Sequence, residues 1–525
     1  MRRHAVIAFI AFSVLSPAPA MAARVLRVGT YHGVRGQFRT IQAAVNAAKP
    51  GDWVLVAPGD YKTRSGRAPK GASDVPAGVL ITTAHLHLRG MDRNRVVVDG
   101  TKSGPKCSNA DADQNLGPNN SSGKPLGLNG VMVWKAGGVW VQNLTACNFQ
   151  GGAGGNGNEI WWNGGENGAI GGWGFYGTNL NATTTYFKDE PTAAQYGIFS
   201  SNWSGGTWDN TYASNFNDSD YYIGACQQVC NQTVNHAWAQ HSALGYSGSN
   251  SGGQLVIENS QFDHNKDGFD TNSQNGDNPP PQDGSCPNGG TSPITHTHSC
   301  WVFIHNYVHD NNNPNVPSAG SAAAGPVGTG MSLSGARNDT ITGNRFVNNG
   351  AWGVIIVPYP DSGDPCTGGT QTNAACLYDE FGDAVLNNTF TNNGSFGNPT
   401  NGDIGWTSAE PDPTPCFAGN TDTGGTLTST PANIQQGYPV CDGHTVPTDP
   451  QSGPFTLEVL CDSQISLTAG AQPPCLPSDS YPRFTQAILP PLPPAKQLPS
   501  MKNACAGVPA NPWCPAKKQK KHRPR

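Results

Sequence analysis

The chain repeats short apolar strands in which every second residue is polar, separated by turns rich in Asn and Gly. In "GMSLS", this alternation sends Met331 and Leu333 to one face and Ser332 and Ser334 to the other. Related segments are "GQLVIENSQFDHNKDGFDTN", "CWVFIHNYVHDNNN" and "DAVLNNTFTNNGSFGN". Asn and Gly tolerate left-handed backbone conformations, so each turn can be sharp. The pattern predicts many short strands joined by tight turns.

Glycines at the start of apolar strands mark the length of the repeat. Gly245 and Gly268 are 23 positions apart, and so are Gly330 and Gly353. A self-similar period of roughly 20–45 residues is typical of a solenoid. An Asn follows most of the strands, and we expect it to anchor the turn and to bond to the neighbouring coil. These residues are Asn143, Asn259, Asn306, Asn344 and Asn388.

The solenoid has a distinct opening. "FRTIQAAVNAA" (38–48) has helical spacing of its apolar residues, and "WVLVA" (53–57) is typical of a strand. A short amphipathic helix in this place can cap the open end of a stacked structure. The run "TIQAAVNAAKPGD", followed by "VLVAPGDY", resembles the opening of right-handed parallel β-helix proteins of the pectin-lyase-like superfamily. The resemblance covers about residues 25–410 and implies an all-β fold, a right-handed parallel β-helix (β-solenoid) of PbH1-type repeats.

Four segments are predicted. Residues 1–22 have a basic start, an apolar run and a small-residue cleavage site, so we expect a secretory signal peptide. Residues 23–410 form the β-helix with its N-terminal capping helix. Residues 411–515 are rich in Pro and Cys and form an irregular C-terminal region that carries disulfides. Residues 516–525 are a basic, disordered tail.

The fourteen cysteines agree with export, because an even number outside a reducing cytosol favours disulfides. Pairing of neighbours is the simplest of many possible schemes. It gives Cys107–Cys147, Cys226–Cys230, Cys286–Cys300, Cys366–Cys376, Cys416–Cys441, Cys461–Cys475 and Cys505–Cys514. We therefore predict a secreted or cell-envelope location.

The net charge of the chain limits the kinds of molecule that it is expected to bind. Charged residues make only 13% of the chain, and the formal net charge is −5. The tail holds six and the signal peptide two of the 31 basic residues, which leaves 23 against 36 acidic ones. Such an acidic body is not typical of a nucleic-acid binder. We predict a monomer whose partner is a polysaccharide, and whose tail, Lys517–Arg525, solubilises the chain or contacts an anionic wall polymer or surface.

The segment 262–277, "FDHNKDGFDTNSQNGD", concentrates charged side chains. Aligned with "NRFVNNGAWGVIIV", its residues 263–267 fall in a turn. In the strand that follows, Phe269 points inward and Asp270 outward. The repeat is interrupted near this strand by three long inserts, 273–299, 311–328 and 358–382. Long loops on a rigid scaffold often carry function, and these flank one sheet, so we expect a cleft along it.

Two groups of residues border the expected cleft. The candidate catalytic residues are Asp270, Asp267, Lys266 and His264. The candidate substrate-binding residues are Asn272, Asp277, Arg337 and Trp238. A polysaccharide lyase needs a base together with a cation or calcium that neutralises the substrate carboxylate, and calcium is the one candidate cofactor. A glycosidase needs two carboxylates roughly 5–10 Å apart.

Two functions stay open on the sequence. The first is a polysaccharide lyase or glycoside hydrolase with Asp270 at its site. The second is a non-catalytic, adhesin-like surface protein that binds through its tryptophans or loops. The signatures of specific families are absent, including the pectate-lyase Arg-x-Pro-x-x-Arg, the polygalacturonase Gly-His-Gly and the epimerase Asp-Pro-His. The enzyme hypothesis requires a second carboxylate, or a base with Lys or Arg, near Asp270.

Overall fold

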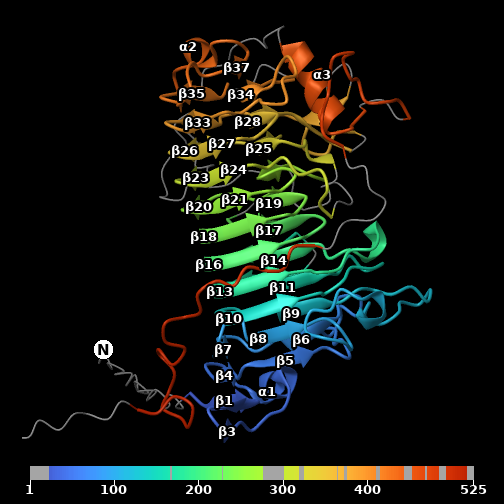
Figure 1. Cartoon of the computed structure of the whole chain (residues 1–525), viewed down its shortest axis with the longest axis vertical. Helices are drawn as coiled ribbons and strands as arrows, with labels where there is room; N and C mark the ends of the chain where they lie inside the picture. The colour runs from blue at the N-terminus through green and yellow to red at the C-terminus, as the bar shows by residue number, and fades with distance from the viewer. Residues whose placement is uncertain are drawn as a thin grey trace, which may run out of the picture.

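The backbone winds into stacked coils, and each coil contributes parallel strands to two long sheets (Figure 1). Successive coils pair in register, for example Thr271 with Leu333 and Met331 with Val354. This confirms the right-handed parallel β-helix. The computed structural model describes residues 23–165, 168–226, 229–275, 301–317, 324–362, 365–371, 375–409, 414–442, 452–466, 470–483 and 492–516.

Sheet one has nineteen strands. They are β1 (Val25–Val28), β4 (Trp53–Val56), β5 (Gly59–Lys62), β7 (His87–Gly90), β8 (Val96–Asp99), β10 (Val139–Cys147), β13 (Phe175–Thr183), β16 (Gly206–Ser214), β18 (Gln232–Gln240), β20 (Val256–Glu258), β21 (Gln261–Asp263), β23 (Trp301–Ile304), β24 (Tyr307–His309), β26 (Asp339–Thr342), β27 (Arg345–Val347), β32 (Ala384–Leu386), β33 (Thr389–Thr391), β35 (Cys416–Ala418) and β36 (Thr421–Asp422).

Sheet two has eleven strands. They are β6 (Ala77–Ile81), β9 (Asn129–Trp134), β11 (Asn158–Asn163), β14 (Tyr196–Ser201), β17 (Ser219–Gly224), β19 (Leu244–Ser249), β22 (Asp270–Asn272), β25 (Thr329–Ser334), β28 (Trp352–Val357), β34 (Gly402–Trp406) and β37 (Ser429–Thr430). The parallel pairing continues through β35, β36 and β37, so the coils extend beyond residue 410, where the sequence repeat fades.

Smaller elements lie at the corners and the ends. Three small sheets pair β2 (Thr30–Tyr31) with β3 (Val34–Arg35), β12 (Gly172–Trp173) with β15 (Trp203–Ser204), and β31 (Cys376–Tyr378) with β29 (Tyr359–Pro360) and β30 (Thr370–Gln371). The helices are α1 (Ile41–Ala47), α2 (Ile434–Gly437) and α3 (Ser452–Asp462), with the 3₁₀ turns η1 (Asp111–Asp113) and η2 (Glu190–Thr192). Among the described residues, no helix has the length and apolar character needed to span a bilayer.

Helix α1 is the predicted cap. Thr40 caps its N-terminus by accepting a hydrogen bond from the backbone N–H of Ala43. Its buried residues, Ile41, Ala44 and Val45, belong to the main core, so the helix covers the first coil.

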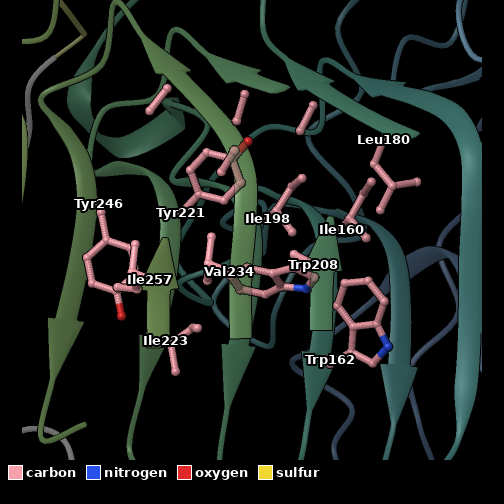
Figure 2. Close-up of a cluster of buried hydrophobic side chains, with 14 of the residues drawn as sticks. Ile160, Trp162, Leu180, Ile198, Trp208, Tyr221, Ile223, Val234, Tyr246 and Ile257 are labelled. Atoms are coloured by element: carbon pink, nitrogen blue, oxygen red, sulfur yellow. The ribbon is translucent and has the colours of Figure 1, made fainter. Parts of the chain in front are cut away.

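Inward-facing side chains of successive coils stack on one another along the axis (Figure 2). Ile160, Ile198, Tyr221 and Tyr246 occupy equivalent register positions in four neighbouring strands of sheet two. Aromatic rings fill much of the space, and those of Tyr246 and Phe269 are stacked with centroids 4.3 Å apart. Burial of such rings is the main source of stability, because each removes a large apolar area from water.

A second stack is polar. The backbone N–H and side-chain amide of Asn306 donate to Asn344 Oδ1, those of Asn344 donate to Asn388 Oδ1, and those of Asn388 donate to Asn420 Oδ1. We call this set the inner asparagine ladder. All four members are buried. The role predicted for asparagine between coils is therefore confirmed, with Asn420 as an additional member.

Six of the predicted disulfides are present: Cys107–Cys147, Cys226–Cys230, Cys366–Cys376, Cys416–Cys441, Cys461–Cys475 and Cys505–Cys514. The predicted Cys286–Cys300 pair lies outside the described residues. So do the predicted signal peptide and Lys517–Arg525.

The C-terminal region turns back on the solenoid. Helix α3 packs on the outer face of sheet two, where Phe455 contacts the ring of Trp352. Residues 492–516, which we call the C-terminal strap, run along the outside of sheet one to the N-terminal end (Figure 1). Lys496 lies 3.6 Å above the ring of Trp238, and near its end the Trp513 indole donates to the carbonyl oxygen of Val34.

Candidate functional site

Asp270 lies on β22 with the orientation that the alternation predicted. Phe269 and Thr271 are fully buried on the inner side, whereas Asp270 and Asn272 face a cavity on the outer face of sheet two. The cavity has a volume of about 300 Å³. We call it the Asp270 cavity.

Three parts of the chain form the walls of the Asp270 cavity. Its floor is the outer face of sheet two, with the hydroxyl groups of Ser247, Ser332 and Ser334 around Asp270. Further lining comes from residues 324–326, shortly before β25, from residues 358–360 and Leu377 at the opposite end of these parallel strands, and from α3 and the residues after it. The remaining lining is mostly apolar and aromatic. Among the described residues of the lining there is no Lys, Arg or His.

The Asp270 carboxylate accepts hydrogen bonds from two side chains and is only partly exposed to solvent. Asn272 Nδ2 donates to it at 2.6 Å and Ser334 Oγ at 3.1 Å. Burial raises the pKa of Asp270 to about 6, and the two hydrogen bonds oppose that rise only in part. A carboxyl group with this pKa exchanges a proton in mildly acidic solution.

Asp267 lies beside Asp270 but behind the cavity wall. Its carboxylate accepts hydrogen bonds from Ser332 Oγ at 2.7 Å and from the backbone N–H of Phe269 at 3.1 Å. Burial, followed by the charge of Asp270, raises the pKa of Asp267 well above its usual range. Asp267 therefore holds Ser332 in position and favours the neutral form of its own carboxyl.

A second carboxylate in the lining is Asp218, which comes directly before β17. Tyr196 Oη donates to it at 3.0 Å. Tyr359 also lines the cavity, and burial, followed by the charges of Asp270 and Asp218, raises its pKa to about 12. Asp218, in the same lining, and Asp267, whose pKa is affected by the charge of Asp270, are therefore the candidates for the second carboxylate that the enzyme hypothesis requires, and that requirement stays a prediction.

The sequence analysis missed Asp218 and Tyr359. Asp218 stands in "NFNDSD", a turn whose position before a strand matches that of the segment preceding β22, and this match could have indicated it. Tyr359 opens the insert after β28, and no sequence signal marks it.

Lys266 does not reach the Asp270 cavity. Its side chain is buried toward α3, and burial lowers the pKa of Lys266 to about 8 against the opposing charges of Asp462 and Asp267. Asp462, at the end of α3, is itself buried with a pKa raised to about 8. Lys266 therefore helps to attach α3 to the coil.

His264 and Trp238 lie on the other side of the coil, at sheet one. Both bond to Asp263: Trp238 Nε1 donates to it at 2.6 Å, and His264 Nδ1 is 2.6 Å from its second oxygen. The C-terminal strap covers this cluster, with Lys496 over Trp238. The expected grouping of His264 and Trp238 with Asp270 is not observed, because the chain turns a corner between residues 263 and 270.

Arg337 is also remote from the Asp270 cavity. Its guanidinium lies 4.7 Å from the ring centroid of Phe381, and Nε donates to the carbonyl oxygen of Asp379 at 3.2 Å. Asp277 lies outside the described residues. Of the predicted set, the structure brings Asp270, Asn272 and Asp267 together.

We expect His264→Gln to change sugar binding and turnover by less than about twofold, because His264 and the Asp270 cavity occupy different faces and do not couple. The same variant should lose stability at pH 5 more than at pH 8. Asp263 raises the pKa of His264, so the stabilisation is present below the ordinary histidine pKa and disappears as pH rises through the raised value. Thermal unfolding at both pH values checks this, and a large loss of turnover would contradict it.

Among the described residues, no group of three acidic, histidine or cysteine side chains close enough to share a metal ion includes Asp270. Ca²⁺ takes six to eight oxygen ligands. The described groups that gather three potential ligand atoms are Asp99 with Cys107 and Cys147, Asp361 with Cys366 and Cys376, and Asp479 with Cys461 and Cys475. Each contains two cysteines that form a disulfide, which leaves one carboxylate.

The coil geometry defines the class, a right-handed parallel β-helix with a loop-walled cavity on one sheet. The A-module of mannuronan C-5 epimerase AlgE6 from Azotobacter vinelandii is similar, with 13% identity, a TM-score of 0.43, and coverage of 74% of this chain and 92% of that chain. A family 28 exopolygalacturonase from Yersinia enterocolitica has 11% identity, a TM-score of 0.42, and 76% coverage of both chains. At these identities the likeness concerns the fold alone. No protein-family model and no curated protein matches the sequence.

Proposed function

We propose that this protein is a secreted glycoside hydrolase that binds a neutral part of a polysaccharide in the Asp270 cavity. The observation that carries the proposal is a carboxyl group with a pKa of about 6 that shares a cavity with a second carboxylate, Asp218. Glycoside hydrolysis uses two carboxyl groups, one as acid and one as base or nucleophile. Two environments that differ in burial and hydrogen bonding suit these two roles.

In the proposed reaction, Asp270 gives its proton to the glycosidic oxygen as the bond to the anomeric carbon breaks. A water molecule adds to that carbon and passes its proton to the Asp218 carboxylate. Asn272 and Ser334 then stabilise the Asp270 carboxylate that remains, since both donate hydrogen bonds to it. Tyr196 keeps Asp218 oriented by the bond to its oxygen.

Charge supports a hydrolase over a lyase. A lyase acting on uronates needs positive charge to neutralise the substrate carboxylate. The described lining supplies two aspartates and no basic side chain, so a uronate there would face repulsion. Its apolar and aromatic walls instead suit the C–H faces of a neutral sugar.

A second candidate, a non-catalytic glycan-binding protein, is favoured by one observation. Among the described residues, the side chains that donate hydrogen bonds to Asp270 are an amide and a hydroxyl, the groups that also line sites which only bind sugars. In that case Asp270 would accept hydrogen bonds from sugar hydroxyls without giving up a proton.

A matched pair of substrates separates these functions. We expect the full mature chain to release reducing ends from galactan or another neutral glycan, without unsaturated product, and to act at least tenfold more slowly on the uronate of the same backbone. Reducing-end and ultraviolet assays on both substrates measure this. Unsaturated product from the uronate would establish a lyase, and binding without product from either would establish the binding protein.

A further inference from the structure

The N-terminal end of the β-helix holds a second hollow, of about 600 Å³, far along the coil from the Asp270 cavity. Arg39, directly before α1, lies on one side of it. Arg64 and Arg67 lie on the loop between β5 and β6. We call this hollow the arginine pocket.

The three arginines have no internal partner. All are exposed, and within the described part of the chain none forms an ion pair or a side-chain hydrogen bond. Three exposed guanidinium groups that line one hollow give this end of an acidic chain, of net charge −5, a local positive charge. Such a charge attracts an anionic ligand.

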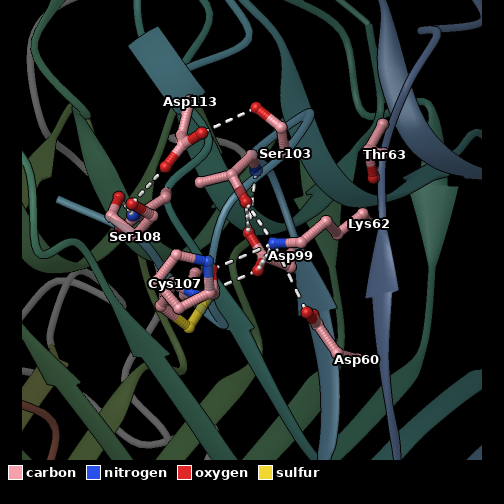
Figure 3. A network of polar contacts seen from close by, with 12 residues as sticks. Asp60, Lys62, Thr63, Asp99, Ser103, Cys107, Ser108 and Asp113 are labelled. Carbon is pink, nitrogen blue, oxygen red and sulfur yellow. Dashed lines mark hydrogen bonds and ion pairs between the residues drawn. A yellow bond between two sulfur atoms is a disulfide. The ribbon is translucent and has the colours of Figure 1, made fainter. Parts of the chain in front are cut away.

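Lys62, the fourth basic residue of the lining, differs from them. Its Nζ pairs with Asp99 at 2.8 Å and with Asp60 at 3.3 Å, within the network that Figure 3 shows. Asp60 also lines the hollow, so one carboxylate faces any ligand there. Lys62 offsets one of these two negative charges, so the four basic and two acidic side chains leave the hollow with a net charge of +2 that a ligand can meet.

We propose that the arginine pocket binds an acidic saccharide through carboxylate or sulfate groups on its sugars. Guanidinium groups match such oxyanions with paired N–H donors. The hollow is large enough for a ligand rather than a bare ion, and Thr63 and Ser65 add hydroxyl groups to its lining. This site retains the protein on an acidic glycan, whereas the Asp270 cavity accepts a neutral unit.

The test measures binding to the full chain by calorimetry, with four probes: a uronate trisaccharide, a sulfated trisaccharide, a neutral trisaccharide and inorganic phosphate. We expect one of the acidic trisaccharides to bind at least about tenfold more tightly than the neutral one, with affinity falling as salt increases. The uronate and sulfate arms identify which group is recognised. Arg39→Gln/Arg64→Gln/Arg67→Gln should lower that affinity at least about tenfold.

A control triple variant removes the same charge from the same end of the molecule. Arg35, Lys49 and Arg95 are exposed and do not line the pocket, so their replacement by Gln should change the affinity less than about threefold. Three results would each overturn the proposal. They are an equal loss of affinity in both triple variants, phosphate binding as tight as that of the acidic trisaccharides, and no preference for the acidic trisaccharides over the neutral one. Turnover of neutral glycan by the pocket variant should be unchanged, which separates this inference from the proposed function.

Discussion

Asp270→Asn is expected to lower the rate of glycan hydrolysis by about 10³-fold at pH 5, because it removes the proton that the leaving oxygen requires. The amide keeps the size of the side chain. Its oxygen can accept the hydrogen bond from Asn272, and its NH2 group can donate to Ser334 Oγ, whose hydroxyl then serves as the acceptor. In the wild type, the rate should fall about tenfold per pH unit above pH 6, since only the protonated form of Asp270 acts as an acid.

Leaving-group dependence distinguishes a general acid from a residue that only holds the site together. An aryl glycoside whose leaving group has a low pKa needs little protonation, so Asp270→Asn should retain far more of its rate on that substrate. Asp209→Asn, which removes a charge at sheet one, is the matched control and should keep full activity. An equal loss on both kinds of substrate would count against Asp270 as the acid.

The variant should also fold. The pKa of Asp270 is raised in the folded state, so its ionisation costs stability as pH rises from about 4 through 6. Asp270→Asn removes that cost and should unfold at pH 8 no more easily than the wild type. A clear loss of stability would mean that the kinetic effect has a structural origin.

Asn344→Ala is expected to reduce the free energy of unfolding by about 2–4 kcal/mol, the largest effect we expect from a single polar residue. Asn344 is the middle of the inner asparagine ladder. Its loss leaves the buried backbone N–H of Asn306 and the carbonyl oxygen of Phe303 without their partners. Chemical denaturation followed by circular dichroism measures the change.

Asn392→Gly is the control for the ladder, and glycine is chosen because residue 392 has a left-handed backbone with φ of 53° that alanine would strain. The Asn392 side chain donates to Asn348 at 2.9 Å on the exposed surface, where water can replace the bond. We expect a change within about 0.5 kcal/mol. If the two variants had the same free energy of unfolding, a residue of the buried ladder would contribute no more to stability than an asparagine pair on the surface.

The fold was predictable because its cause is local and repeated. Three patterns describe a single coil: the alternation of apolar and polar residues in its strands, the Asn and Gly residues at its corners, and the 23-residue spacing. The fold is a stack of such coils. The orientation of Asp270 followed from the same alternation. The neighbour pairing of cysteines held in all six described pairs because close cysteines meet within one coil or at one corner.

The site was only partly predictable, because a site on a solenoid is assembled across coils. His264 and Asp270 are six positions apart, yet a left-handed residue at His264, with φ of 59°, directs the chain around a corner. Asp218 and Tyr359 come from coils on either side of β22. Helix α3, which covers part of the Asp270 cavity, belongs to the irregular C-terminal region. That region has no sequence repeat, so the position of α3 could not be predicted.

The C-terminal strap has a consequence for biosynthesis. The carbonyl oxygens of Ala504 and Ala506 accept hydrogen bonds from Arg89, more than 400 positions earlier, and Trp513 packs in the cluster that holds Trp53. Coils near the N-terminal end of the solenoid are therefore completed by residues that are synthesised much later. Contacts this distant close late in folding. A chain cut before Ala504 would leave these early coils without their cover, so their completion depends on residues that leave the ribosome more than 400 positions later.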